Sequence, residues 1–212
     1  MRKIWVAVSF FILTACSSSI DKPYFDTAGV IRPSNNFCAA DPRTFAKAEP
    51  IKDFSEGNGC GVSNGYKVFA VADVAFSQPA IINCSVANTF NSWLENSVQP
   101  EAQKLYGENV VSVSVASSYA CRPRDNVRGA KLSEHGMGNA IDIAGFTLAS
   151  GRRVVVATDY YAGGNNSAFL KSVRAEACGP FHTVLGPGSD SYHKDHIHLD
   201  LQKERSGGPY CH

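Results

Sequence analysis

Six of the seven cysteines of this 212-residue chain constrain its fold more than any other feature. They are Cys38, Cys60, Cys84, Cys121, Cys178 and Cys211. None belongs to a CxxC pair, so their spacing matches no zinc finger. In an exported chain, an even number of cysteines predicts disulfides, here three, although the sequence leaves their connectivity open. Pairing between neighbours along the chain would give Cys38–Cys60, Cys84–Cys121 and Cys178–Cys211.

The N-terminus predicts that the chain is exported. Arg2 and Lys3 precede an uncharged apolar run at residues 4–13, which is too short to span a bilayer. A short basic segment followed by such a run is typical of a secretory signal. The next residues, Leu13-Thr14-Ala15-Cys16, resemble the lipobox of bacterial lipoproteins. That resemblance implies cleavage before Cys16 and acylation of this cysteine.

We therefore expect a signal peptide at residues 1–15, a lipidated tether at residues 16–36 and one folded domain at residues 37–212. In the alternative, an ordinary signal peptide is cut near Ala15 and Cys16 has no role. A serine rather than an aspartate follows Cys16, which resembles lipoproteins sent on to the outer membrane. We thus expect an envelope protein that faces the periplasm, an oxidising compartment in which disulfides form.

The composition excludes a disordered chain and a nucleic-acid-binding protein. The chain is 44% hydrophobic and 18% charged, as is usual for a globular domain. Its formal net charge is +1, and removal of the expected signal leaves 18 basic and 19 acidic residues. A near-neutral chain lacks the basic surface that nucleic acid requires.

The hydrophobic pattern predicts an α+β fold. Apolar residues at helical spacing predict a helix over residues 82–98, which Pro100 ends or kinks. A second helix is expected at residues 167–177. Strands are expected at residues 66–75, 111–116, 140–147, 153–157 and 196–201. Because these elements do not alternate regularly, we expect a central antiparallel sheet, flanked by helices and stapled by disulfides, rather than a doubly wound fold.

The segment HKDHIHLD at residues 193–200 has the pattern of a metal-binding strand. Side chains alternate along a strand, so His196, His198 and Asp200 share one face. Ile197 and Leu199 lie on the other face. Imidazoles and carboxylates are ligands that zinc prefers, and a catalytic zinc site uses three protein ligands with a fourth position open.

A second segment, SEHGMGNAID at residues 133–142, adds another histidine and carboxylate. If Gly136 and Gly138 turn the chain into a strand, His135 and Asp142 can converge with the C-terminal segment on one ion. The alternative is that these histidines lie in the core or on the surface without a metal. Four histidines and three aspartates in two short segments favour the metal site.

These segments resemble known families. The pattern Ser-x-His-x-x-Gly-x-Ala-x-Asp, followed by His-x-His, resembles the zinc peptidases of peptidoglycan, which include D-alanyl-D-alanine carboxypeptidases and penicillin-insensitive murein endopeptidase. The hedgehog fold shares this pattern. From about Asn36 to the C-terminus, the chain resembles the bacterial extensin-like C-terminal family more closely. The matching segments are residues 118–124, 132–136, 140–146, 185–190 and 195–198.

The resemblance implies a role for each candidate residue. It implies that one zinc ion is held by His135, Asp142 and His198. The two earlier histidines of the C-terminal segment, His193 and His196, serve catalysis in the similar murein endopeptidase pattern.

Other residues have implied roles around this centre. The carboxypeptidase branch has its acidic base at the position of Asp195, whereas strand alternation favours His196, so both remain candidates for the base. Asp200 is expected to orient an imidazole, or else to be a surface carboxylate. Arg122 and Ser133 are the candidates for substrate binding, with Arg122 matching an arginine that meets a substrate carboxylate.

The expected function is a lipid-anchored, zinc-dependent peptidoglycan hydrolase that cleaves stem-peptide cross-links, as a D,D-endopeptidase. Its partners would be peptidoglycan and, through the lipid, the membrane, with no nucleic acid. One alternative is a non-catalytic wall-binding lipoprotein that retains zinc. A second alternative is a disulfide-rich interaction module without a metal.

Overall fold

The computed structural model describes residues 47–203 and 207–212, all within one compact unit, Pro33–His212. The expected signal peptide, the tether with Cys16, and Cys38 lie outside the described residues. Within the described ranges, no helix has both the length and the apolar character that a membrane span requires.

Short strands and helices follow one another along the described chain. The strands are β1 (Lys47–Pro50), β2 (Phe54–Ser55), β3 (Gly61–Val62), β4 (Gly65–Val71), β5 (Val74–Asn83), β6 (Val110–Ser117), β7 (Ala140–Leu148), β8 (Arg153–Val155), β9 (Thr183–Leu185), β10 (Ile197–Asp200) and β11 (Tyr210–Cys211). The helices are α2 (Cys84–Trp93), the π-helical turn η2 (Leu94–Val98), α3 (Gln99–Tyr106), the 3-10 turns η3 (Arg124–Asn126) and η4 (Glu134–Met137), α4 (Val156–Asp159) and α5 (Gly164–Ala177).

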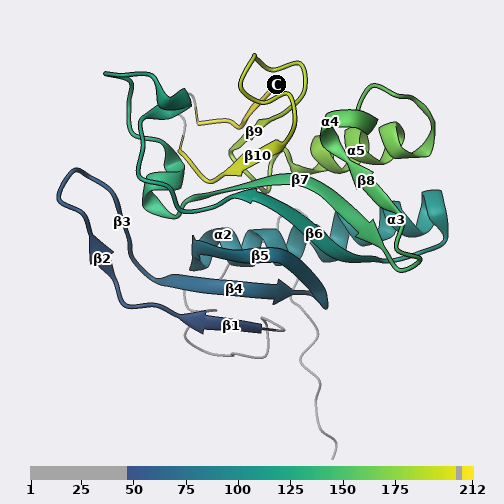
Figure 1. Ribbon diagram of the computed structural model, residues 1–212, viewed down its shortest axis with the longest axis horizontal. Coiled ribbons are helices and arrows are strands. Elements are labelled where there is room, and N and C mark those ends of the chain that lie inside the picture. Colours follow the sequence, from purple (N-terminus) through teal and green to yellow (C-terminus); the bar gives the residue numbers. More distant parts are fainter. Residues whose placement is uncertain (1–46, 204–206) are drawn as a thin grey trace, which may run out of the picture. The chain divides into compact units, whose positions relative to one another are not determined.

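One large sheet organises the described residues (Figure 1). Its strand order is β1-β4-β5-β6-β7-β10-β9-β11, with β8 beside β7. The α+β class is confirmed, but the expectation of a purely antiparallel sheet was wrong, because β5 pairs with β6 and β9 with β11 in parallel. Helices α2 and α3 connect β5 to β6, and such a crossover lets consecutive strands run in the same direction.

The helix expected at residues 82–98 begins later and continues further. Asn83 ends β5 and caps α2, its side-chain oxygen accepting a hydrogen bond from the Val86 N–H at 2.9 Å. Pro100 does not end the helical path, because it lies in the first turn of α3, where a missing N–H costs little. The preceding π-helical turn, Leu94–Val98, makes this restart possible, and Gly107 with φ 68° ends α3.

The segment expected as one strand at residues 66–75 forms most of β4, the hairpin turn that follows it and the start of β5. Strands β4 and β5 pair antiparallel, with Val71 opposite Val74. Ala72 and Asp73 between them both adopt positive φ, at 47° and 59°. Two left-handed residues in succession match the twist of a two-residue hairpin, although the pair lacks the glycine that usually marks such a turn.

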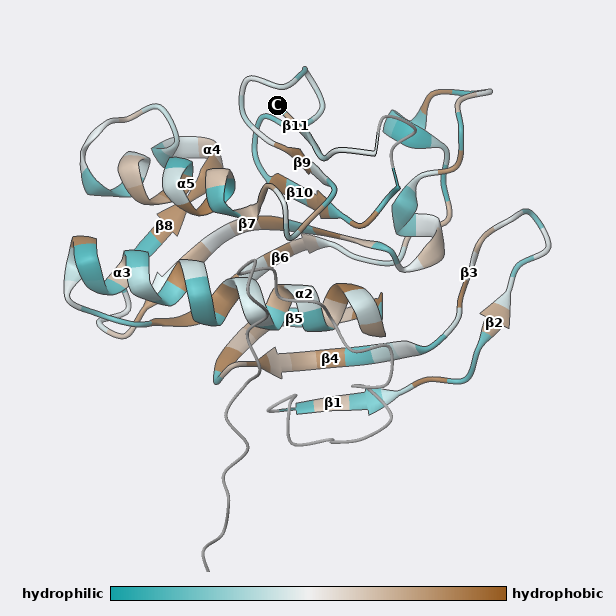
Figure 2. Ribbon diagram, turned by 180° about the vertical axis from the view of Figure 1, so that it is seen from behind, coloured by the Kyte–Doolittle hydropathy of each residue, from teal (hydrophilic) through white to brown (hydrophobic). Residues whose placement is uncertain are grey.

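The hydrophobic core lies between the sheet and helices α2, α3 and α5, as Figure 2 shows from the helical side. Aromatic rings from the helices, from β7 and from the loop before β9 meet there. Trp93 contacts Phe90, Phe146 and Phe181 with ring centroids 5.4 to 6.3 Å apart. Its indole N–H donates a hydrogen bond to the Val173 carbonyl at 3.0 Å, so the polar atom of this buried ring is satisfied.

The two central strands β7 and β10 separate the core from a polar face. Ile141, Ile197 and Leu199 are fully buried in the core. In the antiparallel register, His198 of β10 lies directly opposite Asp142 of β7. Since side chains alternate along both strands, His198 and Asp142 lie on the face away from the helices.

The disulfides differ from pairing between neighbours in the sequence. Cys178 pairs with Cys211 as expected, but Cys60 pairs with Cys121. The expected Cys38–Cys60 and Cys84–Cys121 pairs were therefore wrong. Cys84 is also disulfide-bonded. The chain fold brings Cys60, beside β3, against the loop that follows β6, which no sequence spacing indicates.

Removing the Cys60–Cys121 bridge should destabilise the fold. This bridge spans 61 residues, and closing a loop of that length lowers the entropy of the unfolded chain by an amount worth ~4 kcal/mol. We expect the double variant Cys60→Ser/Cys121→Ser to unfold at a lower urea concentration, with a free energy of unfolding smaller by ~2–4 kcal/mol. Equal unfolding midpoints for the variant and the parent protein would contradict this assignment.

Candidate functional site

Three side chains from three separate segments converge at one point. His135 Nε2 lies 3.1 Å from Asp142 Oδ2 and 3.2 Å from His198 Nδ1. His198 Nδ1 lies 2.8 Å from Asp142 Oδ1. All three residues are buried, with at most 8% of each exposed. Among the described residues, this is the group whose nitrogen and oxygen atoms lie close enough together to share one metal ion.

The local chain geometry explains how His135 reaches this point. It lies in the 3-10 turn η4, which ends at Gly138 in the left-handed conformation with φ 61°. A side chain at Gly138 would place its Cβ 2.9 Å from Val62, so the turn requires a glycine in both respects. The chain then enters β7, which carries Asp142.

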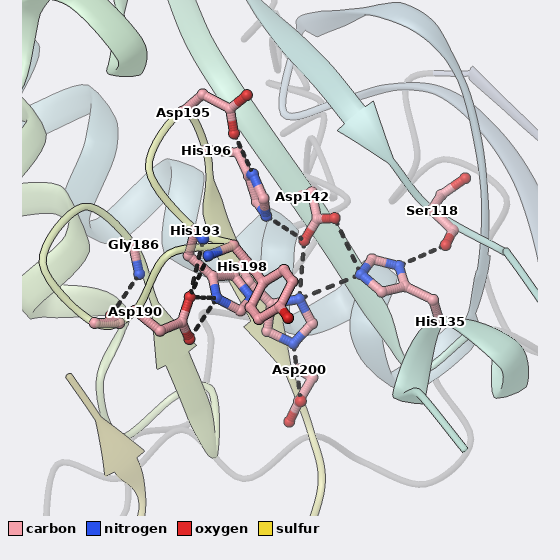
Figure 3. Close-up of polar contacts among 12 residues, drawn as sticks. Ser118, His135, Asp142, Gly186, Asp190, His193, Asp195, His196, His198 and Asp200 are labelled. Carbon is pink, nitrogen blue, oxygen red and sulfur yellow. Dashed lines mark hydrogen bonds and ion pairs between the residues drawn. The ribbon is translucent and has the colours of Figure 1, made fainter. Parts of the chain in front are cut away.

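Hydrogen bonds on the outer sides of both imidazoles direct their inner nitrogens to the centre. His135 Nδ1 lies 2.6 Å from the Ser118 carbonyl, and His198 Nε2 lies 3.0 Å from Asp200 Oδ2. Each outer nitrogen therefore carries the proton of the neutral imidazole and donates it to the oxygen. The inner nitrogens, His135 Nε2 and His198 Nδ1, then carry lone pairs directed at the Asp142 carboxylate (Figure 3).

This donor set fits a zinc ion. Two imidazole lone pairs and a carboxylate are ligand types that zinc prefers. Ligands about 2.0–2.1 Å from a tetrahedral ion lie about 3.3 Å from one another, and the three measured separations are 2.8 to 3.2 Å. Three acceptors that face one another without a proton repel, and a cation removes that repulsion. Asp200 supplies the outer hydrogen bond that commonly orients a metal-binding histidine.

Two further histidines border the centre with the same arrangement of outer hydrogen bonds. His196 Nδ1 contacts Asp195 Oδ1 at 2.8 Å, and its Nε2 lies 3.8 Å from Asp142 Oδ1. His193 Nδ1 contacts both carboxylate oxygens of Asp190 at 2.8 Å. The centroid of the His193 ring lies 5.2 Å from that of the His196 ring and 5.6 Å from that of the His198 ring.

The structure distinguishes the two residues considered for the base. Strand β10 begins at Ile197 rather than at the expected His196, so Asp195 and His196 both precede it in a bend. The Asp195 side chain is 73% exposed and lies on the outer side of His196, away from the cleft. His196 instead presents Nε2 to the centre, as Figure 3 shows.

The electrostatic environment couples Asp142 and His198. Burial disfavours the charge on Asp142, but contacts with His135 and His198 outweigh it and hold the pKa of this carboxyl well below its usual range. Burial also disfavours protonated His198, but Asp142 and Asp200 outweigh it and raise the pKa of His198 to about 9. Without a metal, His198 therefore holds a proton at the point where the three side chains converge and a cation would fit.

The pKa values of two neighbouring groups are shifted in the direction that favours their neutral forms. Burial lowers the pKa of His193, although Asp190 opposes the shift. Burial also raises the pKa of Glu134, a buried carboxyl that accepts a hydrogen bond from the Asn139 amide at 2.6 Å.

The centre lies at the base of a cleft of about 450 Å³. Arg122 and Ser133, the two substrate-binding candidates, both line it, and the Ser133 N–H donates to the Arg122 carbonyl at 3.1 Å. The Arg122 guanidinium has no hydrogen-bond or ion-pair partner among the residues that the structure describes. Within these residues, nothing competes with an anion for this side chain.

Sequence reasoning missed several residues around the cleft. Asp190 forms an Asx turn, accepting hydrogen bonds from the N–H groups of Tyr192 and His193 as well as from the imidazole of His193. An aspartate three residues before a histidine was the available signal. The carbonyl of Ser118 left no signal, since any residue type supplies a carbonyl. The exposed Tyr192 and Tyr210 at the cleft were also missed.

Comparison with known proteins gave one match. The family model described as "Extensin-like protein C-terminus" matches residues 36–212. A search of the curated proteins and a search of the solved structures found no match.

The metal-free protein should lose stability as the pH rises from neutral to alkaline. The raised pKa of His198 stabilises the folded state below its ordinary value of ~6.5, and this contribution is lost as the pH rises through about 9. Asp142 does not change charge in this window, because its lowered pKa matters only in acid. Urea unfolding in chelator at pH 6 and pH 9.5 should differ by on the order of 3 kcal/mol.

The matched variant His198→Gln should show a much smaller difference between the two pH values, whatever its absolute stability. An equal pH dependence in both proteins would assign the effect to other groups.

Proposed function

The chain belongs to the extensin-like protein C-terminus family, and we propose that it is a zinc-dependent peptidoglycan hydrolase that cleaves stem-peptide cross-links as a D,D-endopeptidase. The observation that carries the proposal is the convergence of His135, Asp142 and His198 at the base of an open cleft. Three protein donors that leave one side open suit a catalytic rather than a closed structural zinc site.

The three converging residues would hold the ion, and Asp200 would orient His198. Zinc, when bound, supplies Lewis-acid polarisation of a carbonyl and lowers the pKa of a water molecule. The chain must then provide a base, a group that supports the developing negative charge, and contacts that fix the substrate.

His196 is the proposed base. Its Nδ1 proton is engaged by Asp195, so its Nε2 carries a lone pair at the edge of the centre. An imidazole with its outer nitrogen held in this way can take a proton from water and keep its orientation. Asp195 would act through His196 as its orienting partner.

His193 is the proposed second catalytic histidine. In the tautomer fixed by Asp190, its Nε2 accepts rather than donates a hydrogen bond. It would support an oxyanion only after it has received a proton, so we propose that it takes part in the transfer of the proton to the leaving amine. Its place against His196 and His198 suits this task.

Substrate contacts are proposed at the walls of the cleft. Arg122 lines the cleft, and guanidinium groups bind carboxylates in bidentate fashion. Stem peptides of peptidoglycan carry such carboxylates. Ser133 lies beside Arg122 and would add a hydroxyl contact.

The proposed location rests on the N-terminal sequence. We propose that the chain is exported, acylated at Cys16 and held at the outer membrane facing the periplasm, where peptidoglycan is within reach. The alternative function, a non-catalytic wall-binding lipoprotein with structural zinc, would be favoured by a fourth protein ligand. In the described part of the chain, the group of potential ligands contains three residues.

Metal binding tests the three proposed ligands. We expect one zinc ion per chain in the parent protein and a near-complete loss in His135→Ala, because two donors cannot hold the ion. Asp200→Asn should weaken zinc affinity about 10- to 100-fold, as is usual when the partner of a metal-binding histidine is changed. Zinc content is measured by elemental analysis, and affinity by competition with a chromophoric chelator.

His182→Ala is the matched control for these variants, since His182 does not line the cleft. It should keep full zinc content. Unchanged zinc affinity in His135→Ala would contradict the proposed centre.

Activity tests the proposed base. The zinc-loaded protein, with its disulfides formed, is incubated with purified sacculi, and the muropeptides are identified by mass spectrometry. We expect cross-linked dimers to disappear with the parent protein, and the rate to fall about 10²- to 10⁴-fold in His196→Ala, with zinc content retained. Muropeptides left unchanged by a protein with one zinc per chain would favour the wall-binding alternative.

A further inference from the structure

The mouth of the cleft carries two tyrosines that the proposed reaction does not use. Tyr192 and Tyr210 both line the cleft, yet 53% and 48% of their surfaces are exposed. By contrast, large aromatic side chains of the core such as Phe90 and Trp93 are at most 1% exposed. A cleft of about 450 Å³ is in the size range that holds a drug-sized ligand, which is larger than one amide bond.

We propose that Tyr192 and Tyr210 form a stacking platform that binds sugar rings of a glycan strand at the mouth of the cleft. The identity of that strand, the amino-sugar chain of peptidoglycan, rests on the proposed function. A pyranose ring has apolar C–H faces and a polar edge, so it suits an aromatic ring beside groups that form hydrogen bonds.

The platform is built on the same turn as a proposed catalytic histidine. The Asp190 carboxylate accepts hydrogen bonds from the Tyr192 N–H at 2.7 Å and from the His193 N–H at 3.0 Å. It also holds the His193 imidazole. One carboxylate thus fixes the backbone of Tyr192 and the orientation of His193, so a sugar on Tyr192 would lie at a set position relative to the reacting bond.

Tyr210 is held at the end of the sheet. Its N–H donates to the His182 carbonyl at 2.6 Å, and its ring contacts that of His212, with the centroids 4.3 Å apart and the planes tilted by 42°. This contact supports one part of the ring while about half of the residue stays exposed.

Polar groups of the loop between β6 and β7 line the same cleft. Asp125 and Asn126 in η3 both adopt left-handed conformations, with φ 55° and 56°. Among non-glycine residues, Asp and Asn adopt this conformation most readily, because their short side chains can form local hydrogen bonds. The Asp125 carboxylate accepts hydrogen bonds and the Asn126 amide both donates and accepts them, which suits sugar hydroxyl and acetamide groups.

The backbone of the cleft favours recognition by side chains. Strand β10 is paired with β7 and β9, and β7 is paired with β6 and β10. Neither ligand-bearing strand has a free edge that could pair with an extended peptide. A ligand at the mouth is therefore held by rings and polar side chains, which is how a sugar is bound.

Calorimetric titration of the purified protein with a tetramer of N-acetylglucosamine tests the platform. This probe has no peptide bond, so binding does not depend on hydrolysis. Peptide-free glycan strands are the second probe. We expect saturable binding by the parent protein, and about a 3- to 10-fold loss of affinity in each of Tyr192→Ala and Tyr210→Ala, because the ring contact is removed.

Tyr192→Phe and Tyr210→Phe should retain binding, because they keep the ring. Tyr161→Ala is the matched control, since Tyr161 is 70% exposed but does not line the cleft. Its affinity should be unchanged.

The proposal is overturned if neither probe binds the parent protein, or if Tyr161→Ala weakens binding as much as the two cleft variants. Glycan binding by a protein that leaves the cross-linked dimers intact would support the platform and refute the hydrolase. Loss of the cross-linked dimers without glycan binding would refute the platform alone.

Discussion

The antiparallel pairing of β7 with β10 is the constraint on which the rest of the site depends. It sets Asp142 opposite His198, although 56 residues separate them in the chain. The hydrophobic side chains on the other faces of both strands, such as Ile141 and Leu199, fix the register, because a slip by one residue would turn every side chain to the wrong face. The core thus determines which polar groups meet.

Each of the four histidines at the cleft has an oxygen acceptor on its outer side. A backbone carbonyl serves His135, and aspartates serve the other three. The acceptor decides which nitrogen carries the proton, so all four rings present a lone pair inward in their neutral forms. His135 and His198 meet Asp142 within hydrogen-bond distance, whereas His193 and His196 lie further out. In the proposed function, the inner pair would hold the ion and the outer pair would move protons.

The sequence predicted the converging residues better than their surroundings. Alternation along residues 196–200 and the glycine-bearing turn before Asp142 are local patterns, and the structure brings His135, Asp142 and His198 together accordingly. The disulfide pairing, the parallel β5–β6 pair and the cleft tyrosines depend on chain crossings that no local pattern records. The prediction that Pro100 ends or kinks the helix was wrong for a different reason, because a π-helical turn before it lets the helix restart.

The Cys60–Cys121 bridge has a consequence for the order of assembly. A Cβ added to Gly136 would lie only 3.0 Å from the Cys60 sulfur. This sulfur therefore packs directly on the turn that carries His135. The other half of the bridge, Cys121, follows Ala120, whose N–H donates to the His135 carbonyl at 3.3 Å. Oxidation of two thiols therefore fastens both sides of this turn. In a reduced chain, the turn that carries His135 would lack this fastening, so the order of the three converging side chains would depend on the redox state of two distant thiols.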